Sequence, residues 1–198
     1  MLSIDEHFKQ HSTIVDESFA LMKNRIMSAA CLMVDCLRNG HKIMSCGNGG
    51  SAGDAQHFAA ELVNRYERDR PPLAGLSLST DSSTLTSIAN DFDYSEVFAK
   101  QVIALGRPGD ILLAISTSGN SSNVVEAVKA AHSSGIHVIA LTGRGGGVLN
   151  NILSCDDVLL CVPSGKTAHI QEIHLVVIHC LCHLIDEMMF PQDQNVLP

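Results

Sequence analysis

The chain has 198 residues, of which 45% are hydrophobic, and a formal net charge of −8 at pH 7. That length supports one full-sized domain with a buried core and is too short for two well-formed ones. The acidic balance argues against direct binding of nucleic acid, which requires a basic surface. We therefore expect a single globular domain that does not bind nucleic acid directly.

Membrane and secretion signals are not predicted. No uninterrupted apolar run approaches the roughly 20 residues of a membrane span, and the first ten residues lack a basic region followed by an apolar one. The cysteines form no CxxC pair, and their odd number favours reduced core residues over disulfides. They are Cys31, Cys36, Cys46, Cys155, Cys161, Cys180 and Cys182. We expect a cytoplasmic protein without membrane association.

Apolar runs alternate with amphipathic segments along the chain. Residues 7–37 predict one or two amphipathic helices, and residues 167–190 predict a long apolar helix that ends near Pro191. Between them, strands are predicted at 42–46, 74–78, 111–116, 138–142 and 158–162, and helices at 51–66, 82–89, 94–105, 122–133 and 147–153. Strands that are apolar without alternation indicate an α/β fold whose parallel sheet is covered by helices on both faces. The apolar flanking helices suggest packing between subunits.

The most informative segment is CGNGGSAGDAQHFAAEL, residues 46–62, where a glycine-rich turn joins a predicted strand to a predicted helix. Glycines let the backbone turn sharply, and the free N–H groups of the helix start suit a phosphate. Ser51 or Asp54 is expected to cap this helix. His57 and Glu61, spaced i,i+4, lie on one helix face and form an acid/base or metal pair.

A second loop of this kind, STSGNS at residues 116–121, follows the strand predicted at 111–116. Its hydroxyls supply neutral hydrogen-bond donors at a helix start, which fits an anion. Serines and glycines also form turns and caps without any ligand. Two such loops, both after buried strands, favour a ligand site at the carboxyl ends of a parallel sheet.

The predicted C-terminal helix carries polar residues in an apolar sequence. A single His on such a helix is more often a core or interface residue than a ligand. Gln171 and His179 lie within about 80° of each other on a helical wheel. If the helices meet, they share a site with His57 and Glu61, and this donor set is acceptable for Zn²⁺.

Several long motifs in this order resemble the sugar isomerase (SIS) domain family and, within it, the bacterial phosphoheptose isomerases. The resemblance covers residues 42–190. It rests on CGNGGSAGDAQHFAAEL (46–62), SIANDF (87–92), AISTSGNS (114–121), ALTGRGGG (140–147) and IQEIHLVVIH (170–179).

The resemblance implies a three-layer αβα sandwich with a flavodoxin-like five-stranded parallel sheet and extra N- and C-terminal helices. It implies one SIS domain over 1–198, with N-terminal helices at 1–40 for core and subunit packing and the SIS core at 41–190. It also implies a homotetramer with active sites between subunits. The implied reaction converts sedoheptulose 7-phosphate to D-glycero-D-manno-heptose 7-phosphate through an enediol, at the start of heptose synthesis for lipopolysaccharide.

Site residues follow from the same resemblance. Glu61 and His179 are the expected acid/base residues, and one weakly held Zn²⁺ per subunit is expected on His57, Glu61, Gln171 and His179. Ligand and catalyst are competing roles for Glu61 and His179. Contacts to the phosphorylated seven-carbon sugar are expected from Asn48, Gly49, Gly50, Ser51, Glu61, Asn90, Asp91, Ser116, Thr117, Ser118, Ser121 and Gln171. The chain departs from its relatives at His169, where Arg is usual, and at Ala168, which is Asp in some.

Two other functions remain open at this stage. A related SIS paralogue is a tetrameric binding module for the replication initiator protein, and the segment CLCHLIDEMMFP resembles it. The presence of both Glu61 and His179 favours the enzyme. A dinucleotide fingerprint, Gly47-x-Gly49-x-x-Ala52 with Asp81 as ribose ligand, is a weaker match because Asp81 lies well beyond the usual spacing of about 20 residues.

Overall fold

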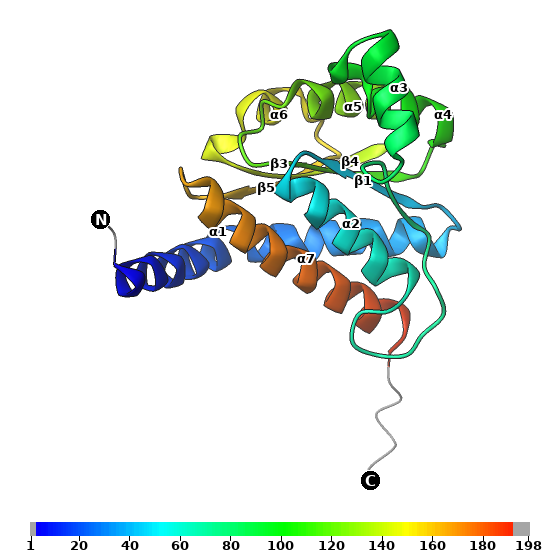
Figure 1. Cartoon of the computed structure of the whole chain (residues 1–198). Coiled ribbons are helices and arrows are strands. Elements are labelled where there is room, and N and C mark those ends of the chain that lie inside the picture. The colour runs from blue at the N-terminus through cyan, green and yellow to red at the C-terminus, as the bar shows by residue number, and fades with distance from the viewer. Residues whose placement is uncertain (1–2, 192–198) are drawn as a thin grey trace.

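The computed structural model describes residues 3–191 as one chain of alternating helices and strands (Figure 1). The helices are α1 (Ile4–Arg38), α2 (Gly50–Val63), α3 (Ser82–Asp91), α4 (Ala99–Leu105), α5 (Ser122–Ser133), α6 (Gly147–Ile152) and α7 (Thr167–Met189), with short 3₁₀ turns η1 (Tyr94–Glu96) and η2 (Arg144–Gly146). The strands are β1 (Ile43–Gly47), β2 (Gly75–Ser77), β3 (Ile111–Ser116), β4 (His137–Gly143) and β5 (Val158–Val162).

The five strands form one parallel sheet in the order β2-β1-β3-β4-β5, which is the flavodoxin order. Gly47 at the end of β1 is opposite Ile115 on β3, and Ser116 at the end of β3 is opposite Thr142 on β4. The carboxyl ends of the three central strands therefore lie along one edge of the sheet.

Helices cover both faces, which confirms the three-layer αβα arrangement (Figure 1). Side chains alternate along β3, so that Leu113 packs with α1, α2 and α7 in one core, whereas Leu112 packs with α4 and α5 in the other. These strands are buried on both faces and are therefore apolar without alternation.

Several predicted boundaries were wrong. The N-terminal region is one helix, as one of the two predicted alternatives had it, but it begins at Ile4 rather than at residue 7, and α2 ends at Val63 rather than at residue 66. The segment 94–105 divides into η1 and α4, because Asp93 accepts a hydrogen bond from the Ser95 N–H and starts a separate turn. The cysteines are free, but Cys31, Cys155 and Cys180 are exposed and are not core residues.

Helix α7 is long and apolar enough to cross a membrane by length and composition alone. Half of its most apolar window is buried in this fold, where it packs against α1 and the sheet. A core helix has the same composition, so this helix gives only weak evidence for a membrane span.

Candidate active site

The candidate site lies where two neighbouring strands, β1 and β3, are followed by helices on opposite faces of the sheet. After β1 the chain continues into α2 on the face that carries α1 and α7, and after β3 it continues into α5 on the other face. The two loops diverge at this point of the carboxyl edge, which is where open α/β sheets bind ligands.

The loop after β1 depends on glycine. Gly49 has φ +56° and occupies the N-cap position of α2 without any side-chain cap, so the predicted capping by Ser51 or Asp54 was wrong. A Cβ on Gly47 would lie 2.5 Å from the Ser51 carbonyl oxygen. The chain therefore packs closely around this turn, and the N–H groups of Ser51 and Ala52 donate to the carbonyls of Asn48 and Gly49 rather than to a side-chain cap.

Asn48 joins the first loop to the second half of the site. Its amide exchanges two hydrogen bonds of 2.8 Å with the amide of Asn123 on α5, and Tyr94 donates a hydrogen bond of 3.3 Å to Asn48 Oδ1. Asn123 is buried. Sequence reasoning missed Asn123 and Tyr94, because neither lies in a glycine-rich turn and their pairing with Asn48 is a long-range contact.

Two imidazoles and a carboxylate meet between α2 and α7. Nε2 of His57 lies 3.1 Å from Nε2 of His179 and 3.3 Å from Oε1 of Glu61. The His179 ring also packs beside Tyr66, with 5.6 Å between ring centroids. The predicted acid/base residues are thus linked through His57, and α2 and α7 do meet as the site requires.

Gln171 reaches the same region from α7. A Cβ added to Gly50 would overlap the side-chain amide of Gln171, so this amide lies directly over the first turn of α2. Only glycine at position 50 leaves this space.

The expected zinc ligands fit a metal in donor type, but within residues 3–191 the donor atoms of His57, Glu61 and His179 do not all lie within 4.8 Å of one another, and only the two imidazoles have ligand spacing. Two nitrogens bound to one tetrahedral Zn²⁺ are about 3.3 Å apart, given Zn–N bonds of about 2.0–2.1 Å. The 3.1 Å between His57 Nε2 and His179 Nε2 is close to this value. A direct hydrogen bond between the imidazoles has the same length, with one ring donating and the other accepting.

Asp54 lies one turn before His57 on α2. Burial raises the pKa of this carboxyl, and the nearby imidazole of His57 opposes the rise. One carboxylate oxygen is buried without a hydrogen-bond partner among residues 3–191. The α2 face thus has a second carboxyl that sequence reasoning considered only as a cap.

The serine loop after β3 is held by its own hydroxyls and by the loop after β4. Ser116 and Ser121 share a hydrogen bond of 3.0 Å, and Ser118 Oγ accepts one of 3.1 Å from the Asn120 N–H. Gly119 has φ +66°, and its backbone packs directly against Gly146. Ser121 is the N-cap of α5 without a side-chain cap bond, so its hydroxyl is not engaged in capping that helix.

Asn90 and Asp91 lie at the exposed end of α3. The amide of Asn90 donates a hydrogen bond of 2.8 Å to Asp91, and within residues 3–191 no hydrogen bond joins this pair to the other expected site residues. The predicted substrate contacts of these two residues stay a prediction.

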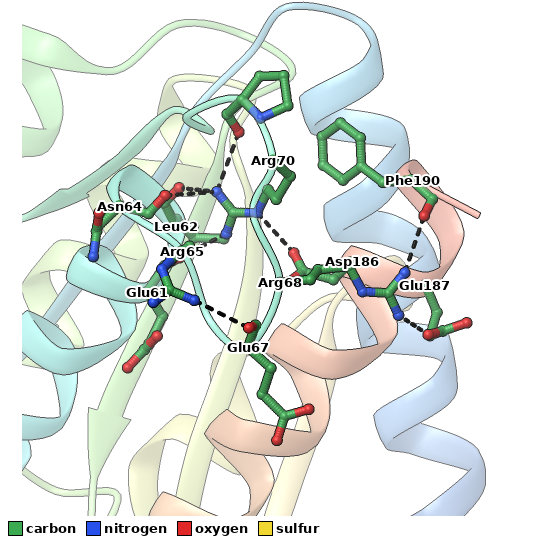
Figure 2. A network of polar contacts seen from close by, with 11 residues as sticks. Glu61, Leu62, Asn64, Arg65, Glu67, Arg68, Arg70, Asp186, Glu187 and Phe190 are labelled. Carbon is green, nitrogen blue, oxygen red and sulfur yellow. Dashed lines mark hydrogen bonds and ion pairs between the residues drawn. The ribbon is translucent and has the colours of Figure 1, made fainter. Parts of the chain in front are cut away.

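A buried arginine fixes the end of α2 against α7 (Figure 2). Arg70 donates hydrogen bonds to the carbonyl oxygens of Glu61 (2.6 Å) and Leu62 (2.7 Å) and pairs with Asp186 at 2.8 Å. The side chains of Arg70 and Asp186 are only 2% and 3% exposed. Arg70 therefore sets the position of the helix turn that carries Glu61, a role that the sequence did not reveal.

Comparisons agree with this architecture. The SIS domain model matches residues 6–143. Phosphoheptose isomerases of Shewanella sp. (strain ANA-3) and Shewanella baltica (strain OS155) are each 58% identical to this chain over 191 residues, 96% of either sequence.

Solved structures give the same result. The phosphoheptose isomerase of Neisseria gonorrhoeae superposes with a TM-score of 0.89 at 51% identity, over 93% of this chain and 97% of that one. The enzyme of Francisella tularensis gives 0.91 at 46% identity, over 93% and 96%. On these matches, the chain belongs to the SIS domain family, within its phosphoheptose isomerase branch.

Proposed function

We propose that this chain is an aldose–ketose isomerase that converts sedoheptulose 7-phosphate to D-glycero-D-manno-heptose 7-phosphate. The observation that carries the proposal is the group of Glu61, His57 and His179 between α7 and α2, the helix that begins at the glycine-rich turn. The 58% identity to named phosphoheptose isomerases supports the same reaction. This step begins the synthesis of heptose precursors for lipopolysaccharide.

Glu61 is the proposed base. Moving a carbonyl from C2 to C1 requires removal of a proton from C1, formation of a C1–C2 enediol, and return of the proton to C2 on the same face. A single carboxylate performs both transfers. The Glu61 side chain is suited to this role because it is 20% exposed and its helix turn is fixed by Arg70.

His179 is the proposed group that moves protons between the oxygens on C1 and C2. An imidazole both accepts and donates protons through its two ring nitrogens. Its contact with His57 orients the ring. A Zn²⁺ held by His57, Glu61, Gln171 and His179, when bound, supplies polarisation of the substrate carbonyl.

The two loops are the proposed sugar-phosphate site. The glycine-rich turn before α2 and the hydroxyls of Ser116, Ser118 and Ser121 present neutral donors to the phosphate and the sugar. Asn48, Gln171 and the exposed Asn90–Asp91 pair complete the proposed contacts along the chain of the sugar.

Assembly and environment belong to the same proposal. The chain forms one SIS domain and a cytoplasmic homotetramer without a direct nucleic-acid or membrane partner. Exposed apolar side chains on α1, among them Ile4, Phe8 and Phe19, support association between subunits. The net charge of −8 supports the lack of nucleic-acid binding.

The test is direct conversion. Purified protein is incubated with sedoheptulose 7-phosphate and followed by proton NMR, after chelation and again after zinc is restored. New aldose signals are expected, with the larger rate in the zinc-restored sample. A protein that binds the sugar but forms no aldose under either condition would contradict the proposed reaction.

Metal content is measured separately. Elemental analysis of zinc-supplemented wild-type protein and of His57→Ala is expected to show less zinc in the variant. Equal content would remove His57 from the metal site and leave the isomerase reaction itself to the NMR assay.

A further inference from the structure

A second group of imidazoles surrounds a carboxylate where the first turns of α1 meet the first turns of α7. His7 and His11 come from α1, and His169 and Glu172 come from α7. These helices pack against each other along much of their length. None of the four residues is among the proposed catalytic, substrate or zinc residues.

Three of these side chains already have the spacing of metal ligands. A donor atom from each of His7, His169 and Glu172 lies within 4.8 Å of the other two, and within residues 3–191 this is the one such group of three His, Cys, Asp or Glu. Nε2 of His7 is 3.4 Å from Oε1 of Glu172. The rings of His7 and His169 meet edge to face with 5.1 Å between centroids.

His169 is the buried member of this group. The residue is 2% exposed, and its Nε2 is buried without a hydrogen-bond partner among the described residues. Leaving a buried polar nitrogen unpaired destabilises the fold. A ring whose nitrogens are not engaged within the fold is available to present a lone pair to an ion.

His11 holds the carboxylate from outside. Its Nδ1 lies 2.7 Å from Oε2 of Glu172, and because an ionised carboxylate only accepts, His11 donates this bond. The other carboxylate oxygen of Glu172, Oε1, faces His7. Metal-binding carboxylates are commonly oriented in this way by an outer hydrogen bond.

We propose that His7, His169 and Glu172 bind one divalent transition-metal ion of the zinc class, with His11 orienting the carboxylate. Two imidazoles and a carboxylate match the ligands that Zn²⁺ accepts, with water completing a tetrahedral shell. The ion would tie the first turns of α1 to α7. The alternative is that these histidines only form ion pairs with Glu172 and bind no metal ion.

This site is separate from the proposed active-site metal. Glu172 follows Gln171 in sequence, but successive residues on a helix point about 100° apart. The Gln171 side chain lies over Gly50, whereas the Glu172 side chain contacts His7 and His11. The inference therefore does not rest on the proposed isomerase reaction.

The experiment uses calorimetric titration of chelator-treated protein with Zn²⁺, and with Co²⁺ for its visible absorption. To remove the active-site ligand set, all variants carry His57→Ala. We expect the His57→Ala protein to bind one ion per chain. Adding His7→Ala to it is expected to abolish this binding. His11→Ala is expected to weaken affinity by about 10–100-fold, the usual effect of losing an outer hydrogen bond.

His137→Ala, at an exposed histidine on β4, is the matched control and should bind as His57→Ala alone does. The melting temperature should rise with Zn²⁺ in the control but not in the His7→Ala variant, because an ion that binds only the folded state stabilises it. Binding of no ion by His57→Ala, or equal binding after His7→Ala, would overturn the proposal.

Discussion

Glu61 is the residue on which the proposed chemistry depends most. We expect Glu61→Gln to lower kcat by at least about a hundredfold, because the amide keeps the size of the side chain but removes the general base. The measurement is the initial rate of aldose formation at saturating sugar. Glu126→Gln, at a glutamate on α5 that pairs with Lys129, is the matched control and should keep wild-type activity. A Glu61 variant within a few-fold of wild type would assign the base elsewhere.

His174 gives a pH-dependent prediction. Burial lowers its pKa to about 4, partly offset by its hydrogen bond to the Thr142 carbonyl. The unfolded state, with a pKa near 6.5, takes up this proton first as pH falls, so stability is fully present above about pH 6.5 and is lost toward pH 4. The shift corresponds to about 3 kcal/mol.

His174→Gln keeps a donor for the Thr142 carbonyl but does not titrate. Urea unfolding between pH 7 and pH 4 should therefore show a shallower loss of stability in this variant than in wild type. Parallel pH profiles for the two proteins would mean that another group controls acid sensitivity.

Sequence reasoning identified the residues of the site that lie in recognisable turns or at helical spacing. The glycine turn and the pair His57–Glu61 are local patterns, and the structure places His179 beside them. Asn123 and Arg70 were missed because their roles come from partners far away in the chain. Asn90 and Asp91 were expected at the site from resemblance alone, and their side chains contact only each other in the recorded hydrogen bonds within residues 3–191.

At the scale of elements, the sequence predicted best where burial and local signals agree. The strands at 111–116 and 158–162 and the helix at 122–133 match β3, β5 and α5 residue for residue. The end of α2 was predicted three residues too late. The only local stop signal is Asn64 at the C-cap, and the chain leaves the helix where Arg70 takes up the carbonyls of Glu61 and Leu62.

The first turn of α2 offers a matched glycine pair. Gly50→Ala places a Cβ against the amide of Gln171, whereas Gly53→Ala, in the same helix, meets nothing within 4 Å. We expect Gly50→Ala to lower kcat/KM by about tenfold or more, because it displaces a group of the site. Gly53→Ala should keep activity and raise stability by about 0.5–1 kcal/mol. Equal activity of the two variants would show that the Gln171 position is not needed.

The link between α2 and α7 is testable through Arg70 and Asp186 (Figure 2). Arg70→Met leaves the Asp186 carboxylate buried without its partner, which should cost about 3–5 kcal/mol in chemical unfolding. Adding Asp186→Leu removes this charge and should restore most of the stability. Activity should stay low in the double variant, because the hydrogen bonds to the Glu61 and Leu62 carbonyls are still absent. Full recovery of both properties would make Arg70 purely structural.

At the scale of the whole molecule, the N-terminal half of α1 extends beyond the sheet (Figure 1). Ile4, Phe8 and Phe19 are 78%, 68% and 64% exposed, and at 100° per residue they lie within about 60° of one another on the helix. An apolar stripe of this kind on a projecting helix is typical of a subunit interface. Family resemblance, rather than any local pattern, is what predicted the number of subunits.

Phe8→Glu tests this stripe. Burying a charge at the centre of an apolar contact costs desolvation energy, which favours separation of the subunits. The variant should therefore shift from a four-chain mass to a smaller mass in light scattering after gel filtration. Lys9→Glu introduces the same side chain about 100° around the helix, away from the stripe, and should leave the mass unchanged. If both variants keep the wild-type mass, the stripe does not hold the subunits together, and the assembly must use other exposed apolar residues such as Leu175 and Val176 on α7.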